Sequence, residues 1–260
     1  MAQSAPHLAV ARNYDLDAPP SRPVPRAVGS GAPRAVDHWP APSLEEAAIR
    51  ADASSASEAQ LGPFWQYVMD GHLVICGSTS TPERRYVIAH RARDAGCRPR
   101  PLGRIETAVL VRVLCGDQQK LVAADLGIAC STASKWYTEA IKKLHLESSP
   151  VPLPLVLAAQ SWASGRALDV DARCTEFEYE GSEFLSLSAS LPVGRSSQLT
   201  LAELEVAKLV IDGASRWHIA AHRSTSAQTV ACQLRGVYSK FKLSGRFALI
   251  RYVEEAGWFR

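Results

Sequence analysis

Apolar positions between residues 199 and 243 follow helical spacing, but the polar run Arg-Ser-Thr-Ser at 223–226 interrupts them. A single packed helix has no use for such a break. Thr200, with Glu203 three residues later, has the pattern of a capping box, and Ser215 and Ser226 stand where two further helices would begin. The pattern therefore predicts three short helices, the last of them running from Ala227 to about Phe241.

The third predicted helix has two different faces. Its apolar face repeats at i, i+4, i+7 and i+11 and consists of Val230, Leu234, Val237 and Phe241. The opposite face carries no acidic residue and consists of Gln228, Ala231, Cys232, Arg235 and Ser239. Two short helices joined by a polar turn, with one face of the second left free, indicate a helix-turn-helix.

The chain also contains an internal repeat. Shifting the sequence by 97 positions lays residues 102–146 on residues 199–243 without a gap, with identities such as Glu106/Glu203 and Gly116/Gly213. We therefore predict a duplicated unit, with helix-turn-helix features in both copies.

The second copy resembles the LuxR-type helix-turn-helix of bacterial transcription regulators. The resemblance rests on "LTLAELEVAKLVIDG", "HIAAHRSTSAQTVACQLRGVYSK" and "GRFALIRYV" (245–253), the last being similar to the family's fourth helix. The first copy keeps a Leu-Gly-Ile turn at 126–128, where the second has Arg-Ser-Thr at 223–225. Prolines at 150, 152 and 154 crowd the start of the first copy's fourth helix, and we expect them to disturb it. One of the two copies serving only a structural role is the open alternative.

The remaining segments complete the predicted architecture. Residues 65–91 and 175–192 alternate polar and apolar positions around Asp-Gly or Glu-Gly turn signals, which predicts β-hairpins. Residues 1–60 are rich in Pro, Ala, Ser and Arg, so we expect a disordered arm, with at most a transient helix at 44–51. The expected fold is mainly α: an arm (1–60), a hairpin with a divergent helix-turn-helix unit (61–165) and a hairpin with the LuxR-type unit (166–260).

Composition excludes several other classes. The six cysteines lie at wide spacings without a zinc-ligand pattern, and the 260 residues contain no GxSxG, P-loop, HExxH or dinucleotide-binding motif. We therefore expect no enzyme, no cofactor and no metal. The sequence has no apolar run of membrane-spanning length and no signal-peptide pattern, so we expect a cytoplasmic protein without a membrane contact. Net charge is only +3, but nine Lys or Arg face five Asp or Glu between residues 199 and 260.

The resemblance implies double-stranded DNA as the partner and transcription regulation as the function. In the second copy it places Gln228, Ala231, Cys232 and Arg235 in the major groove and directs Ser226, Thr229 and Lys240 toward phosphate. The equivalents in the first copy are Ser131, Ser134, Lys135 and Thr138 in the groove, with Thr132, Lys142 and Lys143 behind them. The alternative for each of these residues is an ordinary solvated surface position. For Arg235 a further alternative is an ion pair with Glu203 or another acid.

Two questions about partners stay open at this stage. Helix-turn-helix units also serve as protein-interaction modules, for example in docking on RNA polymerase. The resemblance implies a homodimer through the fourth helix around Phe247, Ile250 and Val253, whereas the duplication would allow one chain to act as a pseudo-dimer on unlike half-sites. We favour the homodimer.

Overall fold

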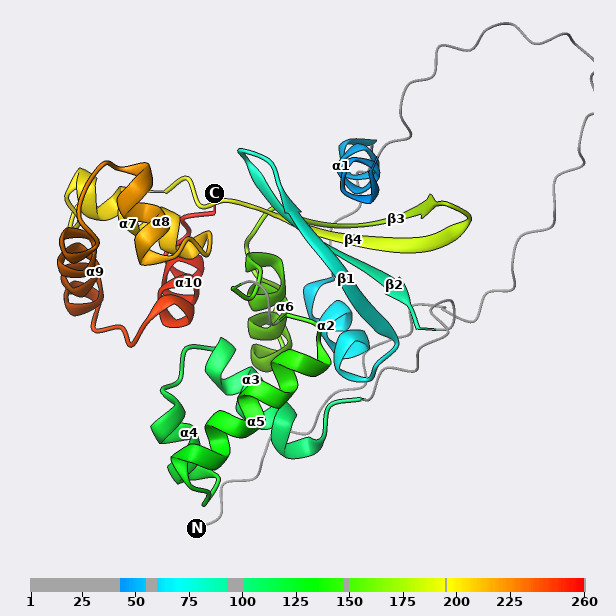
Figure 1. Cartoon of the computed structure of the whole chain (residues 1–260), viewed down its shortest axis with the longest axis horizontal. Helices are drawn as coiled ribbons and strands as arrows, with labels where there is room; N and C mark the ends of the chain where they lie inside the picture. Colours follow the sequence, from blue (N-terminus) through cyan, green and yellow to red (C-terminus); the bar gives the residue numbers. More distant parts are fainter. Residues whose placement is uncertain (1–42, 55–59, 93–100, 147–149, 195, 260) are drawn as a thin grey trace, which may run out of the picture. The chain divides into compact units, whose positions relative to one another are not determined.

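The computed structural model describes residues 43–54, 60–92, 101–146, 150–194 and 196–259. Within these ranges the chain is mostly helical with one four-stranded antiparallel sheet (Figure 1). In chain order the elements are α1 (Leu44–Ser54), α2 (Leu61–Met69), β1 (Leu73–Ser80), β2 (Arg84–Arg91), α3 (Arg104–Leu114), α4 (Gln119–Asp125), α5 (Cys130–Lys143), α6 (Leu153–Ser164), β3 (Ala172–Tyr179), β4 (Ser182–Ser190), α7 (Leu201–Ile211), α8 (Arg216–His222), α9 (Ala227–Phe241) and α10 (Arg246–Glu255). None of the helices in these ranges is long and apolar enough to span a membrane.

The two predicted hairpins exist, and they combine into a single sheet of order β1-β2-β4-β3. The Glu180-Gly181 turn joins β3 to β4 as predicted, and both residues have positive φ. The Asp70-Gly71 signal has a different role: it ends α2, and the first hairpin turns at residues 81–83 instead. Residues 65–69, which we expected in a strand, therefore belong to a helix.

The shift of 97 positions reappears in the helices. It carries the bounds of α3 onto those of α7 and the bounds of α4 onto those of α8, and it aligns the starts of α5 and α9. The shift also carries Ile88 onto Leu185 and Ala89 onto Ser186. Ile88 pairs with Ser186 and Ala89 pairs with Leu185, so the shift maps the pairing of β2 with β4 onto itself. The two hairpins thus meet about a local pseudo-twofold axis.

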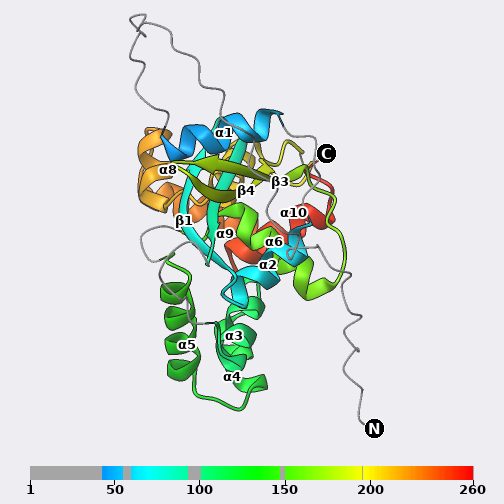
Figure 2. The same cartoon turned by 90° about the vertical axis from the view of Figure 1, so that its right-hand side faces the viewer.

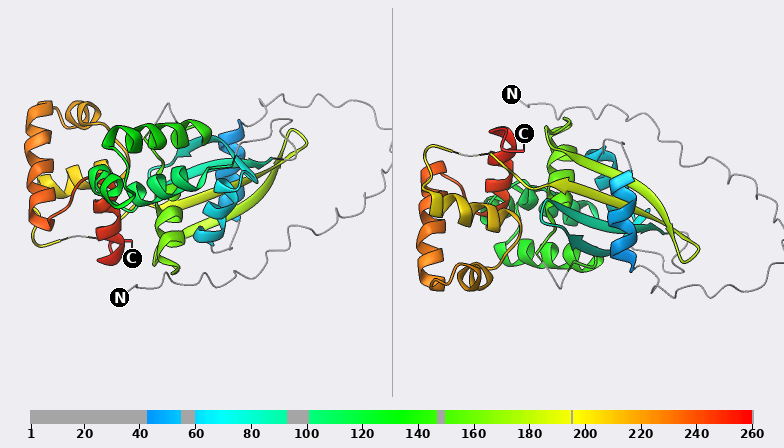
Figure 3. Two further views of the ribbon diagram at one scale, coloured as in Figure 1. Left: turned by 90° about the horizontal axis from the view of Figure 1, so that it is seen from below. Right: turned by 90° about the horizontal axis from the view of Figure 1, so that it is seen from above.

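The two faces of the sheet are covered by different helices. Helix α1 crosses the strands on one face, and α2 and α6 lie on the other (Figures 2 and 3). The face toward α6 is apolar, with Val87, Ala89, Leu187 and Ala189 essentially buried. This core continues through α3, α7 and α10, so the two repeat halves share one hydrophobic core.

Helix α1 corrects the prediction of a disordered arm over residues 1–60. Residues 44–54 form a helix in which Ala48 and Asp52 are buried against the sheet. Residues 1–42 and 55–59 of the predicted arm lie outside the described residues. The sequence indicated a transient helix at 44–51, and its stable docking was missed because its fully buried positions are an alanine and an acid.

The three prolines do not disturb the fourth helix of the first copy. Pro152 is the N-cap residue of α6 and Pro154 lies in its first turn, where no intrahelical N–H bond is lost. All residues from Leu153 to Ser161 are buried. The prolines therefore set the start of a fully covered helix.

Candidate nucleic-acid interface

The second helix-turn-helix is built on three side-chain caps, as the sequence indicates. Thr200 Oγ1 accepts from the Glu203 N–H at 3.3 Å, Ser215 Oγ from the His218 N–H at 3.2 Å, and Ser226 Oγ from the Thr229 N–H at 3.0 Å. These bonds fix where α7, α8 and α9 begin. The predicted capping box is complete, because Glu203 also accepts from the Thr200 N–H at 2.8 Å.

Helix α9 has the two faces that its sequence predicts. Val230 and Val237 are fully buried, and Leu234 and Phe241 are half-buried against the core. On the other side Gln228, Cys232, Arg235 and Ser239 are exposed and Ala231 is half-buried. A row of small and polar side chains is thereby left free to meet another surface.

Arg235 lines a shallow hollow between the start of α8 and the second half of α9. Its lining residues are Arg216, Ala231, Leu234, Arg235, Tyr238, Ser239, Lys242 and Leu243, around about 640 Å³ of space. Three of them are cationic, and none of the three forms an ion pair within the described part of the chain. Arg235 does not pair with Glu203, which was the alternative that the sequence left open.

Lys240 and Lys143, which we expected to face phosphate, are engaged within the chain. Lys240 Nζ lies 2.6 Å from Glu203 Oε2, and Lys143 Nζ lies 2.6 Å from Glu106 Oε2. The two pairs are equivalent under the repeat, and each joins the last turn of the third helix to the first turn of the first helix. Their first role is therefore to hold the helix-turn-helix together, which the sequence pattern did not reveal.

The turn of the second unit is closed by a polar clamp. Arg223, which stands where the first unit has Leu126, donates from Nε to Glu205 at 3.0 Å and from Nη1 to Gln233 at 2.7 Å. Its side chain is only 12% exposed. In the first unit the position equivalent to Gln233 is Trp136, which packs against a small apolar cluster. The turn of the second unit is thus anchored by polar contacts of Arg223.

The predicted contact residues of the first unit also lie on one helix, α5. Ser131, Ser134, Lys135, Thr138 and Lys142 are exposed, and Thr132 is half-buried. However, the N-cap residues of α3, α4 and α5 are Gly103, Gln118 and Ala129, and none of them makes a side-chain cap hydrogen bond. The first unit keeps the helices and loses all three caps.

The two units are packed together through α6 and α10. Gln160 Nε2 of α6 donates to Leu114 O at 2.9 Å and to Phe247 O at 3.3 Å. Arg246 donates to the carbonyl oxygens of Val210, Val151 and Ile211 at 2.9–3.0 Å, and its burial lowers the pKa of its guanidinium to about 10. These bonds connect the end of α7 to the segment before α6.

This packing corrects the expected dimer surface. Ile250 and Val253 of α10 are completely buried within the chain, and Phe247 is half-buried against the same core. The apolar side of α10 is therefore already covered by α6, α7 and α3. A homodimer through these side chains would require α10 to leave its own chain.

Comparison with known proteins supports the second unit independently. Searches of curated proteins and of solved structures gave no significant match. The family model of the bacterial regulatory proteins, luxR family, matches residues 197–253, which span α7, α8, α9 and most of α10. Residues 197–253 of this chain are therefore a LuxR-type helix-turn-helix domain, the DNA-binding domain of a family of transcription regulators.

Proposed function

We propose that this protein regulates transcription by reading duplex DNA with α9 in the major groove. The observation that carries the proposal is the free face of α9, where Arg235 is exposed and without an ion-pair partner in the described residues. Arginine is the side chain best suited to guanine, since its two N–H groups match O6 and N7. Gln228, Ala231 and Cys232 lie on the same face and complete the proposed base-reading set.

Affinity requires cations at phosphates beside that face. Arg216 at the first turn of α8 and Lys242 at the end of α9 line the same hollow as Arg235. We assign phosphate contact to these two residues in addition to Thr229 and Ser226, whose hydroxyl groups remain exposed. Lys240 contributes indirectly, by holding Glu203.

A matched pair of substitutions tests the proposal. Arg235→Ala should weaken binding to the preferred site by about 1–3 kcal/mol and relax base preference there. Lys242→Ala should weaken preferred and random duplexes alike and reduce the salt dependence of binding. Sites selected from a random duplex pool, followed by titrations at several salt concentrations, provide the measurement. Equal losses on preferred and random DNA for both variants would contradict the assignment of Arg235.

We further propose that α5 is a second recognition helix. Ser131, Ser134, Lys135 and Thr138 would meet bases, with Thr132 and Lys142 near phosphate. The geometric support is that α3, α4 and α5 repeat the bounds and spacing of α7, α8 and α9.

One observation favours a different function for the first unit. Ile105, Leu121 and Leu126 are exposed by 46%, 53% and 37% on α3, α4 and the turn that follows. If these side chains form one apolar patch, they would mark a protein contact, so docking on RNA polymerase or another regulator is the second candidate. Leu121→Ser would impair that docking and leave DNA affinity unchanged.

A further inference from the structure

Helix α1 is held on the sheet mainly by charge and hydrogen bonds. Of its eleven residues only Ala48 and Asp52 are buried, and Asp52 is 2% exposed. A helix attached through an apolar stripe would bury several large side chains. The anchoring of α1 therefore rests on what surrounds the Asp52 carboxylate.

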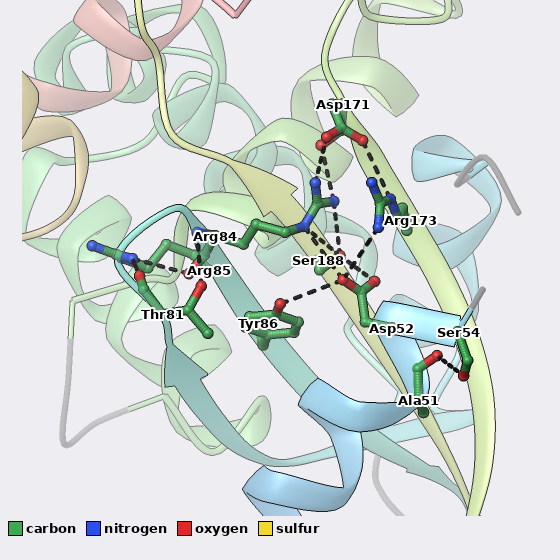
Figure 4. Close-up of polar contacts among 10 residues, drawn as sticks. All are labelled: Ala51, Asp52, Ser54, Thr81, Arg84, Arg85, Tyr86, Asp171, Arg173 and Ser188. Atoms are coloured by element: carbon green, nitrogen blue, oxygen red, sulfur yellow. Dashed lines mark hydrogen bonds and ion pairs between the residues drawn. The ribbon is translucent and has the colours of Figure 1, made fainter. Parts of the chain in front are cut away.

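That carboxylate is surrounded by donors from three strands (Figure 4). Ser188 Oγ of β4 donates to Oδ1 at 2.7 Å, and the Tyr86 hydroxyl of β2 donates to Oδ2 at 3.3 Å. Arg84 Nε lies 3.4 Å and Arg173 Nη1 lies 3.9 Å from Oδ2. Two hydrogen bonds and two ion pairs to one anion make a carboxylate-binding site.

The site belongs to the sheet and not to α1. Arg84 is oriented by Asp171, which accepts from Nη1 through its carboxylate and from Nη2 through its backbone oxygen at 3.2 Å, and by Ser188 at 3.0 Å. None of these partners lies on α1. The donors would thus keep their arrangement if α1 were displaced.

The covered face also contains donors that α1 does not use. Strand alternation places Thr175, Ser186 and Ser190 on the same face as Arg173 and Ser188. Their hydroxyl groups are buried and have no hydrogen-bond partner in the described part of the chain, with Ser186 0% and Thr175 8% exposed. Buried hydroxyl groups normally have hydrogen-bond partners, so this face has hydrogen-bonding groups that α1 leaves unused.

The edge of the site is open to solvent at β3. The side chains of Arg173 and Asp171 are 35% and 51% exposed. A small molecule could reach the cluster there, beside the buried carboxylate of Asp52.

We propose that the sheet face beneath α1 is a binding site for a small carboxylate ligand bearing further hydrogen-bond acceptors, and that Asp52 occupies it as an internal competitor. The ligand's carboxylate takes the place of Asp52 between Arg84, Ser188, Tyr86 and Arg173. Its additional acceptors meet the free hydroxyls of Thr175 and Ser186, and α1 leaves the sheet. The proposed site does not depend on which DNA sequence the protein reads.

The next residue of β2 connects the sheet to the LuxR-type domain. Arg85 holds Asp212, the C-cap residue of α7, through two contacts, with 2.6 Å between Nη2 and Oδ2. Arg84 and Arg85 are adjacent in sequence and point to opposite partners, α1 and α7. The proposed site therefore lies one residue away from the side chain that anchors the LuxR-type domain.

Removal of the competitor tests the site directly in the full chain. Acetate and succinate serve as probes, titrated calorimetrically against chloride at constant ionic strength. Asp52→Ala should bind succinate about tenfold or more tightly than the natural chain, because apparent affinity falls with the fraction of molecules that have the site free. Arg84→Gln added to Asp52→Ala should abolish the binding. Glu45→Ala, which removes an exposed acid from the same helix, should leave affinity unchanged.

A second measurement distinguishes a natural ligand site from a cavity that the substitution of a structural aspartate creates. Succinate should accelerate amide hydrogen exchange of residues 44–54 in the natural chain, whereas β2 and β4 should keep their protection. Where Asp52→Ala does not fold, Asp52→Asn keeps the side-chain volume and takes its place in both measurements. Equal affinities of the Asp52 and Glu45 variants, no binding to either Asp52 variant, or slower exchange of residues 44–54 with succinate would each overturn the proposal.

Discussion

Two glutamates illustrate how single residues hold each helix-turn-helix together. Glu203 accepts from the Thr200 N–H and pairs with Lys240, while Glu106 accepts from the Gly103 N–H at 2.7 Å and pairs with Lys143. The hydrogen bond from Lys240, followed by that from Thr200, lowers the pKa of Glu203 below 4.5. For Glu106 burial acts in the opposite direction, but the bonds from Lys143 and Gly103 outweigh it and its pKa is also lowered.

The lowered pKa of Glu203 gives a stability prediction with a defined pH window. Because the folded pKa lies below 4.5, the carboxylate's stabilisation is fully present above that pH and disappears as pH falls through the folded pKa. Glu203→Gln should lower the free energy of unfolding by about 0.5–1 kcal/mol at neutral pH, because Gln still accepts from the Thr200 N–H but loses the charge that pairs with Lys240. Denaturant titrations of both proteins at a series of pH values measure this difference, which should close in acid. Glu255→Gln, an exposed position on α10, is the control, and a gap that persists at low pH would contradict the role of the charge.

The sequence predicted those residue contacts that join neighbours in the chain. Thr200, Ser215 and Ser226 cap the helices that the sequence assigns to them, because a cap depends only on the next three residues. The ion pair of Lys240 joins residues 37 positions apart, and no local pattern contains it. Arg223 likewise bonds to Glu205 and Gln233, which are 18 and 10 positions away, so no local pattern contains these contacts.

At the scale of elements, helix α3 approaches α10 at a single glycine. Gly116 follows α3 with φ +94°, and an added Cβ would lie 2.6 Å from Ala248 Cα and 2.7 Å from its nitrogen. Ser244 Oγ donates to Gly116 O at 2.8 Å beside this contact. The approach leaves no space for a side chain, because the obstructing atoms belong to the backbone of α10.

Gly116→Ala should therefore destabilise the protein more than backbone strain alone would. Gly127 is the matched control, since it also has positive φ (+66°) but nothing lies within 4 Å of an added Cβ. Gly127→Ala should cost about 1 kcal/mol, whereas Gly116→Ala should cost several times that amount because α10 must move. Thermal unfolding of the two variants checks the difference. Similar losses would show that α10 does not pack on α3 as closely as described.

Two helices were predicted incompletely. In α1 a buried residue is polar, and in α6 the effect of prolines at the helix start was misjudged. Helix α1 was expected only as a transient helix, because its covered side offers small apolar side chains and Asp52 and buries no large side chain. Helix α6 was expected to be disturbed by the prolines at its start, but the structure shows no disturbance. At the N-cap and first turn a proline is compatible with a helix.

At the scale of the described chain, the two halves related by the shift of 97 positions form an internal pair. Antiparallel pairing of β2 with β4 joins the two halves, and the local symmetry of that pairing resembles the contact between two copies of one chain. The sequence could predict both hairpins but not their union, because strand pairing over about a hundred residues leaves no local signal. With Ile250 and Val253 buried, helices α3 and α6 of the chain's own first half take the place that we had given to a partner.

This internal pairing changes the expected DNA complex from two chains on a palindrome to one chain on an asymmetric site. The exposed face of α5 offers Ser134, Lys135 and Thr138, whereas that of α9 offers Ala231, Cys232 and Arg235, so the two half-sites should differ in sequence. The mass of the complex on a selected site, measured by light scattering, should correspond to one chain per duplex.

Charge reversal on α5 tests whether the first unit takes part in DNA binding. Lys135 is exposed on that helix, so Lys135→Glu would place an acid against phosphate or a base edge and should weaken binding by about tenfold or more. Arg104→Glu makes the same charge change at the exposed first residue of α3, outside the proposed recognition face, and should have a much smaller effect. Equal affinities of the Lys135→Glu protein and the natural chain would assign the first unit a structural role. Two chains on a palindromic site would restore the homodimer, through a surface other than the buried side of α10.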